Sequence, residues 1–213
     1  MPGRSDPYYE IHLFETGQVH TRPDSKHDLF NALAWLAFPQ TKARINALHA
    51  REIAREGGKR GRLRDLLTLL DEGGALVACR DETLEPLVRR FQWKELFWER
   101  RADVLSGLSV SVLGHATLDM AREPWPGITC KAIFLPADRR ADESAAEWLA
   151  SARTPEQLAA FPVFGYPGWF PGNDDPSFYA DERYFRPLRR GKMAPGSWPD
   201  SRCTKVQRKV RAP

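Results

Sequence analysis

"KHDLFNALAWLAFPQTKARINALH", residues 26–49, contains two helical patterns that meet at Phe38-Pro39. Asp24 and Ser25 precede the stretch, and both residue types cap helices well because a side-chain oxygen can accept hydrogen bonds from the first free amides. Pro39 disfavours helical geometry in the residue before it and can itself begin a new helix. The stretch therefore predicts a helical hairpin, in which the first helix ends at Phe38 and the second runs to about Arg55.

Each predicted helix carries a row of polar side chains beside an apolar arc. At 100° per residue, the first helix has its apolar arc at Leu29, Phe30, Leu33, Leu36 and Ala37, and its polar row at His27, Asp28 and Asn31, next to Trp35. The second helix has a polar stripe at Lys42, Asn46 and His49. We expect the apolar arcs to pack on a sheet and the polar rows to line a groove. Alternatively, these polar side chains only flank the core.

His27 is the better base candidate of the two histidines in the hairpin. It lies in the first turn of its helix, where the positive end of the helix dipole favours the neutral imidazole. A neutral imidazole can accept a proton or bind a metal ion. His49 lies in the middle of its helix and could equally be a packing residue.

Two further candidate groups follow along the chain. The leucine pattern of residues 62–71 predicts a third helix, and Asp71-Glu72 lie at its C-terminal end. Its residues Asp65, Thr68 and Glu72 share one side and could hold a divalent cation, or they could pair with neighbouring arginines. His115 directly follows the strand pattern "LSVSVLG", where sites usually form in α/β units. It could also serve only as a capping or packing group.

The loop "GGKRGR", residues 57–62, places glycines and three basic side chains before the third helix. Backbone amides and the helix N-terminus could bind a phosphate there, together with Lys59, Arg60 and Arg62. The spacing is not that of a Walker motif. The alternative is a flexible, solvated loop.

The remaining patterns predict an α+β (mixed α/β) fold. Strands are expected at residues 11–14, 75–79, 107–113 and 128–136, and the strand–helix–strand order of residues 107–136 suggests a βαβ unit or a split version of one. "ADESAAEWLA" and "TPEQLAAF" are expected to be short helices. We therefore predict a helical N-terminal half on a small sheet, followed by an irregular wrap rich in aromatic residues and proline. One domain is expected over residues 1–196, with a disordered basic tail at 197–213.

Composition places broad limits on location and partners. The 213 residues carry a net charge of +4, which predicts weak, salt-dependent nucleic-acid binding at most. The three cysteines are odd in number and far apart, as is typical of a reducing cytoplasm. No apolar run approaches the roughly 20 residues that cross a bilayer. We therefore expect a cytoplasmic protein without membrane association.

Four segments occur in an order that is similar to a known family. These are "HDLFNALAWLAFPQTKARINALH", "RDLLTLLDEGGALV", "LGHATLDMA" and "FPVFGYPGWFPGNDDPSFYADERYFRP". Together they resemble the bacterial domain-of-unknown-function family 3025, from about Tyr9 to Pro187. The resemblance implies a bacterial protein that shares the fold of the family. It implies no activity, so function must be argued from the residues.

Two functional hypotheses from different classes follow from the residues. In the first, the protein is a hydrolase-type enzyme whose polar cleft is lined by His27, Asp28, Asn31, Lys42, His49, Asp71, Glu72 and His115, with a divalent metal as a possible cofactor. In the second, the glycine-basic loop and the arginines bind nucleic acid or another anion without catalysis. The first requires the histidines to lie together, and the second requires a continuous basic face.

Overall fold

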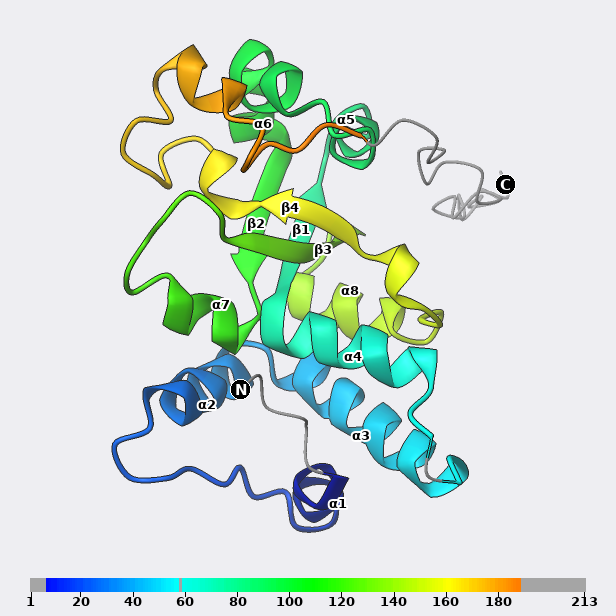
Figure 1. Ribbon diagram of the computed structural model, residues 1–213. Coiled ribbons are helices and arrows are strands. Elements are labelled where there is room, and N and C mark those ends of the chain that lie inside the picture. The colour runs from blue at the N-terminus through cyan, green and yellow to red at the C-terminus, as the bar shows by residue number, and fades with distance from the viewer. Residues whose placement is uncertain (1–6, 58, 189–213) are drawn as a thin grey trace, which may run out of the picture.

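The computed structural model describes residues 7–57 and 59–188 (Figure 1). The N-terminal half forms α1 (Pro7–Thr16), α2 (Lys26–Ala37), α3 (Pro39–Arg55), α4 (Arg62–Gly73) and then β1 (Gly74–Cys79). Next come α5 (Leu84–Arg89), the π-helical turn η1 (Glu95–Glu99), α6 (Arg101–Gly107), β2 (Leu108–Val112), α7 (His115–Met120), β3 (Thr129–Pro136) and α8 (Ala141–Trp148). The last elements are β4 (Ala159–Pro162) and the 3₁₀ turns η2 (Pro155–Gln157), η3 (Val163–Gly165) and η4 (Pro176–Ala180). The fold is α+β, as predicted; the segment 197–213 lies outside the described residues.

The helical hairpin is confirmed at both ends of its junction. Ser25 caps α2, because its side chain accepts a hydrogen bond from the Asp28 amide. α2 ends before Phe38, and Pro39 is the first residue of α3. No side chain of the junction caps α3; instead Asp142 of α8 accepts hydrogen bonds from the amides of Gln40 and Thr41, at 3.1 and 2.8 Å. Helix α8 therefore fixes the start of α3.

The four strands described form one mixed sheet in the order β2-β1-β3-β4. β1 pairs antiparallel with β2 and parallel with β3, so that Val77 faces both Val110 and Phe134. β2 and β3 therefore run in opposite directions on either side of β1. The expected βαβ unit over residues 107–136 is wrong in this respect. The parallel pair is β1 and β3, whose long connection includes β2.

Alternate residues of the central strands point into two separate cores, one on each face of the sheet. Ala75 and Val77 belong to an aromatic-rich core with η1 and the C-terminal segment. Leu76 belongs to an aliphatic core with α3, α4 and α8. Figure 1 shows these two sets of elements above and below the sheet. The N-terminal helices thus all lie on the aliphatic side.

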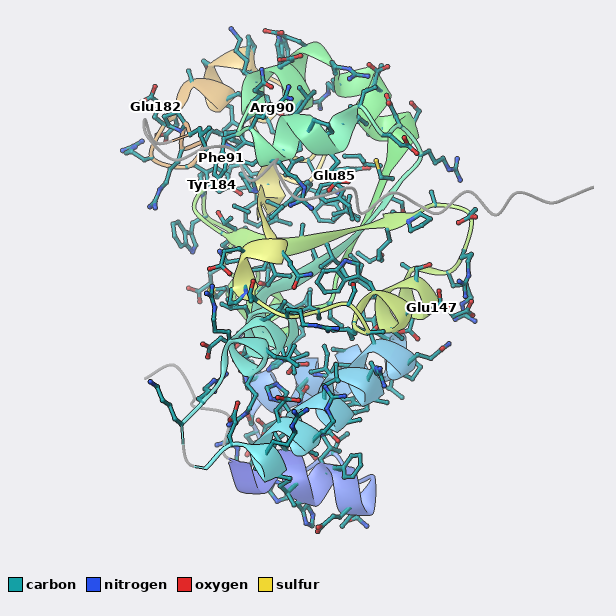
Figure 2. The ribbon with its side chains drawn as sticks, turned by 90° about the vertical axis from the view of Figure 1, so that its right-hand side faces the viewer. Glu85, Arg90, Phe91, Glu147, Glu182 and Tyr184 are labelled. Carbon is teal, nitrogen blue, oxygen red and sulfur yellow. The ribbon has the colours of Figure 1, made fainter. Side chains whose placement is uncertain are left out.

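The C-terminal segment wraps the aromatic core with 3₁₀ turns and irregular backbone, as predicted. Tyr184 anchors it: its hydroxyl donates to the Ile128 carbonyl at 2.8 Å and accepts from the Phe164 amide at 2.9 Å. Figure 2 shows Tyr184 at the same end of the molecule as Phe91, whereas Glu147 of α8 lies across the sheet.

Two short elements were assigned wrongly from the sequence. Residues 11–14 lie within helix α1, because Glu10 and Leu13 turn one face of a helix into the interior. "TPEQLAAF" is a 3₁₀ turn followed by β4, where Cys130 of β3 pairs with Phe161. Both runs are too short for periodicity to separate a helix from a strand.

The apolar arc of α2 faces outward, contrary to the expectation that it packs on the sheet. Leu29, Leu33 and Leu36 are 55%, 46% and 80% exposed. The opposite face, with His27 and Asn31, turns toward α7 and α3 because both side chains find buried hydrogen-bond partners there. Partners for polar groups therefore decided the orientation of this helix.

Candidate functional site

His115 is a buried histidine, with only 5% of its side chain exposed. It is the first residue of α7, directly after the turn that follows β2. Its Nδ1 lies 3.0 Å from the backbone carbonyl oxygen of Asp71. A carbonyl can only accept, so Nδ1 carries the proton and donates, and Nε2 keeps its lone pair. Burial lowers the pKa of His115 to about 4, so the ring is neutral at neutral pH.

His27 of α2 lies next to the lone pair of His115 Nε2. Its Nε2 lies 3.1 Å from His115 Nε2, and the two rings meet edge to face with centroids 4.6 Å apart. His27 is only half-buried. The structure therefore brings together two of the three histidines that the sequence proposed for one site.

Glu72 completes a three-residue group, here called the His-His-Glu cluster (His27, His115 and Glu72). Its Oε2 lies 3.6 Å from His115 Nε2, and one ligand atom from each of the three residues falls within 4.8 Å of the others. Burial and the neighbouring Asp71 charge both raise the pKa of Glu72. Two imidazoles and a carboxylate that converge in this way can accept the protons of a water or hold a metal ion.

Asp71, next to Glu72 in sequence, is engaged differently. Its Oδ1 accepts a hydrogen bond at 2.5 Å from Lys42 Nζ, whose side chain is 3% exposed. Burial alone would raise the pKa of Asp71, but the charge and the hydrogen bond of Lys42 outweigh burial and hold the pKa below its usual range. Asp71 is therefore an ionised partner of Lys42, and Glu72 is the carboxylate that faces the histidines.

Lys42 links this centre to the N-terminal helices. Its Nζ also donates to Asn31 Oδ1 at 2.9 Å and lies 5.5 Å from the centroid of the Trp35 ring. Asn31 Nδ2 in turn donates to Tyr9 Oη at 3.0 Å. The polar rows predicted for the hairpin thus meet at Lys42, and α1 supports them from outside.

Two residues near the centre were missed from the sequence, because a strand was predicted at residues 11–14 and no helix before it. Tyr9 supports Asn31, and Glu10 accepts a hydrogen bond at 2.7 Å from Asn46 Nδ2. A helical reading of "PYYEIHLFE" would have placed Glu10 and Leu13 on one face, which is the signal that was available.

Asp28 lies on the predicted polar row but belongs to another contact. Its carboxylate accepts three hydrogen bonds from Arg22, from the backbone amide and the guanidinium, at 2.8 to 2.9 Å. These bonds hold the pKa of Asp28 well below its usual range. Asp28 therefore fixes the loop before α2 and stands apart from the His-His-Glu cluster.

Two of the three basic side chains of residues 57–62 pair with carboxylates. Arg60 contacts Asp65 at 2.8 Å and also Thr68, and Arg62 pairs with Glu156 of η2. Lys59 is exposed. Asp65 and Thr68 thus contact Arg60, whereas Glu72 of the same helix faces the histidines. Anion binding at Lys59, Arg60 and Arg62 stays a prediction, as does weak nucleic-acid binding at most.

A surface hollow of about 400 Å³ lies elsewhere, on the C-terminal wrap. It is lined by Pro126, Gly172, Asp175, Ser177, Phe178, Asp181 and Tyr184. The two carboxylates in it already accept hydrogen bonds from the amides of Ser177 and Arg183. None of the residues that line this hollow belongs to the His-His-Glu cluster.

His49, the third histidine proposed for the site, is buried in α3. It is 1% exposed, and its Nδ1 has no hydrogen-bond partner among the described residues. Burial lowers the pKa of His49 to about 4. The negative charge of Asp71 would raise this pKa, whereas the positive charges of Arg64, Arg60 and Lys42 lower it further. The folded protein therefore holds His49 in its neutral form.

This burial predicts a pH-dependent stability. The unfolded chain protonates His49 at its ordinary pKa of 6.5 and the folded chain only near 4, so the stability is complete above pH 6.5 and is lost as the pH falls toward 4. At about pH 5 the loss amounts to about 2 kcal/mol. Urea denaturation at about pH 7 and at about pH 5 measures this loss. Between the two pH values, the free energy of unfolding of His49→Leu should fall by about 2 kcal/mol less than that of the wild type. The titration of the other groups contributes equally to both proteins and cancels in the comparison. Equal losses of unfolding free energy in His49→Leu and the wild type would therefore contradict the prediction.

Comparisons with known proteins add a family but no activity. The family model described as "Protein of unknown function (DUF3025)" matches residues 1–189. The comparisons with curated proteins and with solved structures gave no match. Within residues 7–57 and 59–188, every helix is too short or too polar to cross a membrane. The match includes all four segments on which the sequence resemblance rests.

Proposed function

The chain belongs to the DUF3025 family, and because the description of that family gives no activity, we propose a function from the site itself. The protein is a hydrolase that activates a water molecule at the His-His-Glu cluster. The observation that carries this proposal is the approach of His27 Nε2 to His115 Nε2, at 3.1 Å, beside the Glu72 carboxylate.

This geometry fits the activation of water because the Glu72 carboxylate and the ring nitrogens of His27 and His115 converge near the start of α7. In the arrangement seen, His27 Nε2 donates to the lone pair of His115 Nε2. The Asp71 carbonyl fixes the tautomer of His115, so that its lone pair faces His27. Glu72 adds negative charge and has 36% of its side chain exposed. Substrate and water can therefore approach the cluster from the side of Glu72 and the half-buried His27.

The proposed reaction splits one bond of the substrate with one water. The water oxygen forms a bond to an acyl carbon or to phosphorus, and one of its protons leaves toward the cluster. The bond between that centre and the leaving group breaks, and the leaving group departs with the electron pair and takes up a proton. The products together contain the atoms of the substrate and of one water.

The test is a panel of chromogenic carboxylic and phosphoric esters. The wild type should hydrolyse members of one class. His27→Ala, His115→Ala and Glu72→Gln should each lower kcat/KM by at least about 10²-fold, the lower range for removal of a group that transfers protons. His20→Ala, which changes an exposed histidine, is the matched control and should keep full activity.

Either of two results would overturn the proposal. One is a wild-type protein that is folded but hydrolyses neither class of ester. The other is hydrolysis that persists unchanged in both His27→Ala and His115→Ala, which would place the reacting centre elsewhere. Circular dichroism of each variant must accompany the assay, because His115 is buried.

A further inference from the structure

The His-His-Glu cluster has the dimensions of a metal site. We propose that it binds one divalent transition-metal ion of the zinc class, with His27 Nε2, His115 Nε2 and one carboxylate oxygen of Glu72 as ligands and a fourth position open to solvent. This inference uses the residues of the proposed function and names the cofactor, but it stands or falls by metal binding alone.

The distance between the two nitrogens supports this assignment. Two nitrogens that each lie about 2.0–2.1 Å from a tetrahedral zinc ion are about 3.3 Å apart. His27 Nε2 and His115 Nε2 are 3.1 Å apart, and Glu72 Oε2 is 3.6 Å from His115 Nε2. The two nitrogens therefore already have the spacing that a tetrahedral ion requires. The ligand atoms of all three residues lie within 4.8 Å of one another, so the Glu72 carboxylate would rotate toward the nitrogens to complete the site.

The surroundings of His115 are those of a metal ligand. Histidines that bind metals usually donate their other ring N–H to a carbonyl or carboxylate, which fixes the tautomer and orients the ring. His115 Nδ1 has this bond to the Asp71 carbonyl oxygen, and Asp71 Oδ2 lies 3.8 Å from the same nitrogen. The ring can therefore present only Nε2 to a metal.

Lys42 decides which of the two adjacent carboxylates is the ligand. Asp71 is bound to Lys42 Nζ, whereas among the described residues no lysine or arginine lies within ion-pair distance of Glu72, whose neighbour is the His115 ring. Asp71 therefore acts as a positioning residue behind His115, and Glu72 supplies the charge that a divalent ion needs. Three protein ligands with one open position are typical of catalytic rather than structural zinc sites.

The donor set also selects the class of ion. Imidazole nitrogens suit zinc, cobalt, nickel, copper and iron, whereas magnesium and calcium prefer oxygen ligands alone. A bound ion of this class would supply Lewis-acid charge and would acidify a water in the fourth position. The proposed hydrolysis would then draw its nucleophile from that water.

The test measures metal binding on the full chain, without any substrate. Apoprotein prepared with a chelator is titrated with Zn²⁺ by calorimetry and with Co²⁺ by visible absorption. We expect one ion per chain and cobalt d–d bands of the intensity typical of four or five ligands. Magnesium at the same concentration should not compete.

Variants locate the site. His27→Ala and His115→Ala should abolish the cobalt bands, and Glu72→Gln should weaken zinc binding at least about tenfold. Glu82→Gln and His20→Ala change exposed residues of the same types and should bind as the wild type does. His27→Gln at the half-buried position keeps the test valid if His115→Ala fails to fold.

Two results would overturn the metal site: a wild type that binds neither ion, or binding that is unchanged in the His27 variants. These results are separable from the fate of the proposed hydrolase. Zinc binding at the cluster without hydrolysis of any ester would keep the metal site and remove the hydrolase. Hydrolysis that needs His27, in a protein that binds no metal, would keep the hydrolase and remove the metal site.

Discussion

Replacing Lys42 by methionine is expected to lower the free energy of unfolding by about 3–5 kcal/mol, because it leaves the Asp71 carboxylate without its partner in a largely buried position. The Lys42 side chain is 3% exposed and that of Asp71 is 20% exposed, so water cannot replace the lost ammonium fully. The change also removes the hydrogen bond to Asn31. Urea denaturation at neutral pH, followed by tryptophan fluorescence, measures the loss.

Two further variants separate the lost pair from the lost side chain. Lys26→Met removes a lysine that is exposed at the start of α2 and should change stability by no more than about 0.5 kcal/mol. The double variant Lys42→Met with Asp71→Asn removes both charges and should recover much of the loss. A loss below about 1 kcal/mol in Lys42→Met, the range of solvated ion pairs, would contradict the prediction.

Gly114→Ala is expected to lower stability by about 1–3 kcal/mol, or more, by overpacking, and to disable the site as well. The backbone angles at Gly114 are ordinary (φ −65°, ψ 107°), so the need for glycine comes from close approach. An added Cβ would lie 2.6 Å from the Glu72 carbonyl oxygen, the Gly73 Cα and the Gly74 nitrogen. These are backbone atoms, so the chain before His115 must move away from the end of α4.

That movement separates Glu72 from His115, because His115 directly follows Gly114 and the Glu72 carbonyl is one of the groups that the new Cβ would press against. A displacement of about 1 Å at a reacting centre can cost about 10²-fold in rate, and we expect a loss of this size in any activity of the cluster. Gly73→Ala is the matched control, because its Cβ would meet only Thr117 Oγ1 at 3.8 Å. It should be neutral or stabilising by up to about 1 kcal/mol, as for alanine within a helix. Equal effects at the two positions would contradict the argument from close approach.

The sequence by itself determined the elements that have strong local signals. Ser25 and Pro39 fix the ends of α2 and the start of α3, because a cap and a proline act on their own backbone neighbours. The sequence also placed His115 after a strand and Asp71-Glu72 at the end of a helix, and these are the ends that meet. Family membership, too, is a property of the sequence.

Tertiary structure alone decided which candidates meet and what each of them does. Periodicity predicts that α2 has two faces, but it does not say which one is buried; the partners of His27 and Asn31 lie on α7 and α3, far along the chain. For the same reason no local pattern could assign Asp71 to Lys42, Glu72 to the histidines or His49 to the interior. A buried polar group without a partner costs stability, so most such groups lie where a partner satisfies them. That partner is chosen by the packing of distant segments, which local sequence does not encode.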